Sequence, residues 1–191
     1  MLYLLAIIVG IIAGLAMKGR ISNLVEIRFN KVWLIISTAV LLVASQTLSD
    51  RFDFLSGYEF LINGIIFCMV FAWLWLNRQY VGMWVIAVGS LLNMIVMMVN
   101  GGRMPVDRDT VINAGLPIEL LESDIKHYIT SPGDGTRLAF LSDIIAPPGF
   151  LGYMMQVVSI GDLMVVAGLF LLFLQIVSGR KFFDKTISEV E

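Results

Sequence analysis

Five long apolar runs fill most of this chain of 191 residues, and one polar stretch separates the fourth run from the fifth. A helix needs about 20 apolar residues to cross the hydrocarbon core of a bilayer. A backbone in lipid can satisfy its own hydrogen bonds only as a helix or a closed barrel, and these runs lack the apolar–polar alternation of barrel strands. We therefore predict an all-α polytopic membrane protein with five transmembrane helices. The predicted spans are 1–17, 32–48, 58–77, 80–99 and 160–178.

Composition supports a membrane protein and excludes several other classes. Hydrophobic residues make up 58% of the chain and charged residues 15%, and the net charge is -2. This balance predicts a lipid bilayer as the main partner and no nucleic acid. The single cysteine, Cys68, allows no internal disulfide, and no metal-binding spacing of Cys and His occurs. The length predicts a single membrane domain over 1–191, and no cofactor is predicted.

The distribution of Lys and Arg predicts the orientation in the membrane, because cytoplasmic connections carry an excess of these residues. In a five-span arrangement, eight of the thirteen lie on the side of the C-terminus: Lys18, Arg20, Arg28, Lys31, Arg78, Arg180, Lys181 and Lys185. The other five lie on the opposite side: Arg51, Arg103, Arg108, Lys126 and Arg137. We therefore predict that the N-terminus is outside and the C-terminus cytoplasmic.

The same orientation places the polar stretch, the outer cap of residues 100–159, on the extracytoplasmic side. Asp107 is a favourable N-cap and Gly115 a favourable C′ residue, so a short helix is predicted over Arg108–Ala114. Pro117 then fits the first turn of an amphipathic helix whose apolar face includes Leu121, Ile125, Tyr128 and Ile129. Residues 137–145 fit a strand, a helix or extended chain equally well. The cap is thus predicted to be structured, with short helices before the last span.

The cap opens with Asn100-Gly101-Gly102-Arg103-Met104-Pro105, directly after the fourth span. Two glycines allow left-handed conformations, and backbone N–H groups in such a turn can bind an anion together with the Arg103 guanidinium. A plainer interpretation is a glycine-type helix stop followed by a snorkelling or salt-bridged arginine. The sequence leaves both interpretations open.

Two further polar residues in or beside the cap are candidates for function. His127 is either an interfacial, hydrogen-bonded side chain or a ligand, although no zinc or calcium spacing surrounds it. Asp162 follows Ser159 in a capping pattern at the start of the last span, and alternatively pairs with Arg103 or Arg137.

Within the spans, the polar and small residues predict helix packing. Asn63 and Asn93 should face other helices, either as interhelical contacts or as the lining of a pathway, because an unpaired amide in hydrocarbon is costly. Gly10-x-x-x-Gly14 matches a close-packing pattern, and Gly82 and Gly89 allow the same interpretation.

The chain resembles a family of small bacterial integral membrane proteins of unknown function. The resemblance lies in Asn100-Gly101-Gly102-x-Met104-Pro105, the lone His127, Thr136-Arg137-Leu138, Asp143-Ile144-Ile145-x-Pro147 and Ser159-x-Gly161-Asp162. It covers the whole chain, but its distinctive part is 100–162. The resemblance implies a bacterial cytoplasmic (inner) membrane. It implies no activity, cofactor or catalytic residue.

Two hypotheses for the function follow from these residues. In the first, the cap docks a membrane-protein partner, a second copy of the chain or an anionic lipid headgroup. In the second, the protein is an enzyme or carrier for an anionic lipid-linked substrate at the outer leaflet, with His127 or Asp143 as acid or base. The candidate ligand-binding residues are Asn100, Gly101, Gly102, Arg103, His127, Arg137, Asp143 and Asp162.

Overall fold

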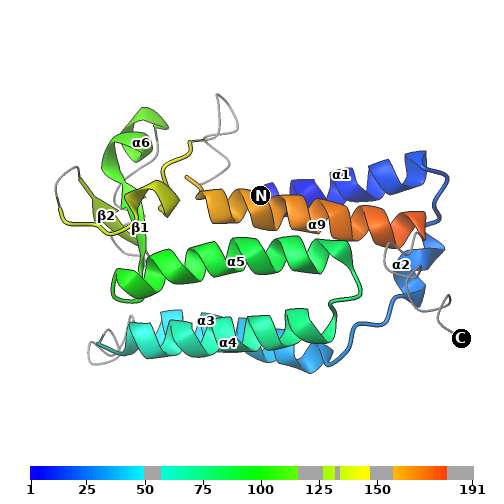
Figure 1. The fold of residues 1–191 in the computed structure, drawn as a ribbon, viewed down its shortest axis with the longest axis horizontal. Helices are drawn as coiled ribbons and strands as arrows, with labels where there is room; N and C mark the ends of the chain where they lie inside the picture. The colour runs from blue at the N-terminus through cyan, green and yellow to red at the C-terminus, as the bar shows by residue number, and fades with distance from the viewer. Residues whose placement is uncertain (50–56, 116–126, 132–133, 147–156, 180–191) are drawn as a thin grey trace, which may run out of the picture.

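The structure is a computed structural model. It describes residues 1–49, 57–115, 127–131, 134–146 and 157–179. Five long helices lie side by side, and a smaller unit, the cap, sits at one end of this bundle (Figure 1). The chain is mostly helical, and the long helices run roughly parallel to the longest axis of the molecule (Figure 1).

The predicted spans coincide closely with the observed helices. These are α1 (Leu2–Ala16), α3 (Val32–Ser49), α4 (Glu59–Leu76), α5 (Val81–Val99) and α9 (Ile160–Ser178), with a short α2 (Ser22–Glu26) after α1. Among the described residues, α4, α5 and α9 are long and apolar enough to cross a membrane. Leu2–Ala16 and Val32–Ser45 are shorter apolar helices.

Glycines let three of these helices approach closely, as the sequence predicted. On α1, a Cβ atom added to Gly10 would lie 2.7 Å from the Phe170 carbonyl oxygen of α9. Between α5 and α9, a Cβ atom on Gly89 would lie 2.5 Å from the Gly161 carbonyl oxygen, and Gly82 meets the backbone of Gly168 in the same way. Real Cβ atoms do not approach that closely, so only glycine fits at these crossings.

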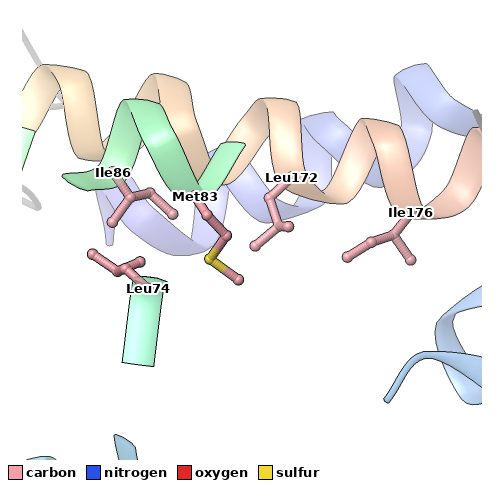
Figure 2. Packing of buried hydrophobic residues seen from close by; sticks show 5 residues of the cluster. All are labelled: Leu74, Met83, Ile86, Leu172 and Ile176. Atoms are coloured by element: carbon pink, nitrogen blue, oxygen red, sulfur yellow. The ribbon is translucent and has the colours of Figure 1, made fainter. Parts of the chain in front are cut away.

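The apolar core lies where α4 meets the α5–α9 pair. Leu74, Met83, Ile86, Leu172 and Ile176 are buried there and point toward one another (Figure 2). The same C-terminal end of α4 is held by a buried amide, because Asn77 Oδ1 accepts from the Asn30 backbone N–H at 2.7 Å and Asn77 Nδ2 donates to the Asn30 carbonyl. These two hydrogen bonds join α4 to the connection before α3.

The cap contains β1 (Met104–Asp107), α6 (Arg108–Asn113), β2 (His127–Thr130) and the 3-10 turn η2 (Ala139–Leu141). The predicted short helix is confirmed as α6, since Asp107 accepts from the Thr110 backbone N–H at 2.9 Å and Gly115 has a positive φ. Within 137–145, the structure selects the 3-10 turn followed by extended residues.

The prediction of an all-α cap was wrong. Strands β1 and β2 pair in parallel, with Met104 opposite His127 and Val106 opposite Ile129. Tyr128 and Ile129 therefore lie in a strand, not in the predicted amphipathic helix; the rest of that helix falls outside the described residues. Aromatic and β-branched side chains favour strands, and pairing with the extended Met104–Pro105 segment outweighs their helical spacing.

Candidate functional site

A cavity of about 430 Å³ opens at the cap end of the bundle, between α1, α5, α9 and the cap. We call it the cap-end cavity. Its polar lining comes from four separate parts of the chain. The lining residues are Met1, Leu2, Tyr3, Phe67, Ser90, Asn93, Met97, Met104, Asp143, Val157, Val158, Asp162 and Val165.

Asp162 is the centre of a hydrogen-bond network in this cavity. Its Oδ1 atom accepts one bond from the Tyr3 hydroxyl of α1 at 2.9 Å and a second from Asn93 Nδ2 of α5, also at 2.9 Å. Helices α1, α5 and α9 thus meet at one carboxylate. Of the two interpretations of Asn93, the structure shows both a contact between helices and a position in the cavity wall.

The same aspartate caps α9, as its sequence pattern predicted. Ser159 Oγ accepts from the Asp162 backbone N–H at 3.0 Å, and Asp162 Oδ2 accepts from the Ser159 backbone N–H at 3.1 Å. This reciprocal capping box satisfies two backbone donors of the first turn. Ser159 Oγ also lies 2.9 Å from Asn93 Oδ1, so the cap of α9 and the α5 amide form one unit.

Asp143 reaches the cavity from the cap through backbone pairing. Its N–H donates to the Pro105 carbonyl at 3.0 Å, and its carbonyl accepts from the Asp107 N–H at 3.1 Å. Two residues later, Ile145 and Val158 exchange a pair of backbone hydrogen bonds of 3.0 and 2.9 Å. The strand β1 and the residues before α9 thereby hold Asp143 against the end of α9, beside Asp162.

Asp143 is 4% exposed, and its environment disfavours a second negative charge. Burial, and then the nearby charge of Asp162, raise the pKa of the Asp143 carboxyl to about 8. A carboxylic acid with such a pKa carries a proton at neutral pH and can release it near that pH. The cavity therefore holds one carboxylate that is fixed by donors and one carboxyl that exchanges its proton near neutrality.

The glycine turn serves as a helix stop, which is the plainer of its two interpretations. Gly101 and Gly102 both have positive φ values, and the Gly102 N–H donates to the Met97 carbonyl at 2.8 Å. This bond is the outer bond of a Schellman C-cap. The Gly102 carbonyl accepts from Asn63 Nδ2 of α4 at 2.8 Å, which gives the second amide predicted within a span a partner on another segment.

The remaining predicted residues hold the cap together at a distance from the cavity lining. Asn100 bonds the Arg137 backbone through both side-chain atoms, with bonds of 2.8 and 3.0 Å, while the Arg137 side chain is exposed. Arg103 Nε lies 3.6 Å from Glu59 Oε2, and its guanidinium lies 6.0 Å from the ring centroid of Tyr128. The His127 backbone belongs to β2, and its side chain lies outside the described atoms.

Of the eight predicted residues, the structure thus brings Asp143 and Asp162 into one cavity. The pairing of Asp162 with Arg103 or Arg137 is not among the contacts of the described residues, where Tyr3 and Asn93 are its partners instead. Sequence reasoning missed Tyr3 as a site residue. Its signal was a hydroxyl in the first turn of an otherwise apolar helix, which also fits an ordinary interfacial tyrosine.

The cavity lining combines acidic, polar and apolar groups. No group of three or more His, Cys, Asp or Glu residues that could hold a metal occurs within the described ranges. Two acidic groups, a phenol and an amide offer oxygen acceptors, whereas Phe67, Met97 and Met104 supply apolar walls. An ammonium group with a hydrocarbon part would match both kinds of lining.

Comparison with known proteins identifies a family whose function is unknown. The sequence model described as "Family of unknown function (DUF5317)" matches residues 26–174. A protein of Thermotoga maritima, named "Uncharacterized protein", is 29% identical over 172 residues, which are 90% of this chain and 87% of the relative. No solved structure matches.

Proposed function

Because the chain belongs to this family of unknown function (DUF5317), we propose a role from the geometry alone: it is an integral membrane binding protein whose cap-end cavity holds the cationic group of a small molecule. The observation that carries the proposal is the convergence of Tyr3, Asn93, Asp143 and Asp162 on one cavity. These residues are distant in sequence, so local folding alone does not account for their meeting.

The proposed setting is the bacterial cytoplasmic membrane, crossed five times, with the cap outside and the C-terminus in the cytoplasm. Three long apolar helices support the membrane location. The orientation is supported by the basic residues Lys18, Arg20, Lys31 and Arg78, which lie in the connections at the bundle end opposite the cap. In this orientation, the cavity faces the outer leaflet.

The sign of the ligand charge follows from the lining. Asp162 accepts from Tyr3 and Asn93, and a cation bound beside it would favour the ionised form of Asp143. An anionic headgroup would meet the charge of Asp162, which already disfavours ionisation of Asp143, and like charges at close range oppose binding. For the cap-end cavity, the geometry therefore favours a cation over the anionic lipid considered from the sequence.

Purified protein in nonionic detergent provides the test. Choline and butylamine should raise the melting temperature in a concentration-dependent way, whereas glycerol phosphate should not, because binding to the folded state stabilises it. Asp143→Asn, which leaves the cap of α9 intact, should abolish the shift. Asp109→Asn, on the exposed face of α6, is the matched control and should keep it. A shift that persists in Asp143→Asn, or that glycerol phosphate also produces, would refute the cation site.

A second role, docking of the cap onto a membrane partner or a second copy, is favoured by a separate observation. Four large apolar side chains of the cap are exposed: Phe140 at 61%, Ile112 at 52%, and Leu138 and Ile144 at 37% each. Exposed apolar residues in a polar cap are typical of contact surfaces. Phe140→Ser should shift the detergent-solubilised protein to a smaller species in size-exclusion chromatography with light scattering. An unchanged mass would argue against docking through this surface.

A further inference from the structure

The turn between α4 and α5, at the end of the bundle opposite the cap, carries two neighbouring hollows, a wide mouth that contains the charged Arg78 and an apolar slot. The mouth is an open hollow of about 500 Å³, lined by Leu76, Arg78, Gln79 and Trp84. The adjoining slot has a volume of about 120 Å³. Its lining residues are Phe71, Leu74, Trp75, Arg78, Met83, Trp84 and Ala87. Arg78 and Trp84 belong to both, so the two hollows are neighbours.

The Arg78 guanidinium is held in place at this mouth. Its Nη1 atom donates to the Trp75 carbonyl at 2.9 Å, and its Cζ atom lies 4.7 Å from the centre of a Trp75 ring. Trp84 Nε1 in turn donates to the Arg78 carbonyl at 3.0 Å. Arg78 is nevertheless exposed, and the guanidinium has further N–H donors beyond the one used by Trp75. A positioned, exposed guanidinium is suited to a phosphate.

We propose that this mouth and slot bind one anionic glycerophospholipid, with its phosphate at Arg78 and Gln79 and part of an acyl chain along Phe71, Met83 and Ala87. The charge of Arg78 complements the phosphate, and the apolar slot complements the chain. The rings of Trp75 and Trp84 lie edge to face, 6.1 Å apart, beside this mouth, and indole rings favour the depth of lipid headgroups in a bilayer. The site is remote from the cap-end cavity and does not depend on its ligand.

Native mass spectrometry of the purified full chain tests the proposal, with phosphatidylglycerol and phosphatidylcholine added as equal competitors. Wild-type protein should retain one phosphatidylglycerol molecule in preference to phosphatidylcholine. Arg78→Gln should reduce that retention about fivefold, the effect expected for one interfacial arginine. Arg20→Gln removes the same charge from the same bundle end, outside the lining of both hollows, and should leave retention unchanged. Equal losses in the two variants would overturn the site in favour of diffuse surface charge.

A second arm separates a lipid from a free phosphate group. Ala87→Leu fills the slot without changing any charge, and it should lower lipid retention as strongly as Arg78→Gln. Excess glycerol phosphate should not displace the lipid from wild-type protein. Retention that survives Ala87→Leu, or that glycerol phosphate abolishes, would overturn the assignment of an acyl chain to the slot. The melting temperature of each variant shows that the chain remains folded.

Discussion

The Tyr3 hydroxyl donates a hydrogen bond of 2.9 Å to Asp162, across a separation of 159 residues. It joins the first turn of α1 to the capping box of α9, at the point where Asn93 of α5 donates to the same oxygen. The start of the chain is thereby part of the wall of the cap-end cavity. A single carboxylate organises three helices, so changes to its partners should affect both stability and the cavity.

Replacement of Tyr3 by Phe removes only the hydroxyl. The lost bond should lower the free energy of unfolding by about 1 kcal/mol, because the aspartate keeps Asn93 as a donor. The matched control is Tyr58→Phe, since the exposed Tyr58 precedes α4 and lies outside the cavity lining. Thermal unfolding in detergent would measure both variants. Equal stability of the two variants would show that the bond contributes nothing.

The raised pKa of Asp143 predicts a pH dependence of stability. The folded carboxyl titrates at about 8, whereas its ordinary value is 3.8, so between these pH values the folded state holds a proton that the unfolded state has lost. Stability should therefore fall as pH rises through this window, by up to about 1.4 kcal/mol per pH unit.

Asp143→Asn removes this titration. Between pH 5 and pH 9, the melting temperature of the variant should therefore depend less on pH. The stability of the variant relative to wild type should increase as the pH rises. Asp109→Asn provides the comparison at an exposed position and should keep the wild-type slope. Parallel curves for wild type and Asp143→Asn would show that Asp143 does not titrate in this range.

Two helical glycines with different surroundings test the packing of α5 on α9. Gly89→Ala would bring a methyl group to within 2.5 Å of the Gly161 carbonyl oxygen, so it should destabilise the fold by about 1–3 kcal/mol. Gly64→Ala in α4 meets no atom within 4 Å and should be neutral or stabilise by up to about 1 kcal/mol. Unfolding by a denaturing detergent would rank them, and a Gly89→Ala variant as stable as wild type would contradict the close crossing.

The two glycines of the turn after α5 should differ in the same manner. Both have positive φ values, but a Cβ atom on Gly102 would lie 2.6 Å from the Phe60 backbone, whereas one on Gly101 would meet nothing. Gly101→Ala should cost about 1 kcal/mol for its conformation alone. Gly102→Ala should cost clearly more, because the start of α4 must also move. Comparison of their melting temperatures checks the order, and the reverse order would mean that the turn packs differently.

Features that depend on neighbouring residues could be predicted from the sequence. The five apolar runs predicted the helices to within about two residues, because length and composition decide which segments can bury their backbone bonds. Asp107 and Ser159 marked true helix starts, because a cap is complete within four residues. Gly10 and Gly89 marked close crossings, because the lack of a side chain has the same consequence wherever helices meet.

The residues that line the candidate site, and the charge of the ligand they suit, became clear from the tertiary structure. Arg103, Arg137 and the glycine turn suggested an anion, yet the glycines close α5, and the cavity is lined by Asp143 and Asp162. The strand pairing of Tyr128 and Ile129 was hidden by their helical spacing, since a strand needs a partner that periodicity does not reveal. Tyr3, Asn93, Asp143 and Asp162 meet because helix packing and backbone pairing bring distant segments together. No local pattern in the sequence shows that these distant segments come together.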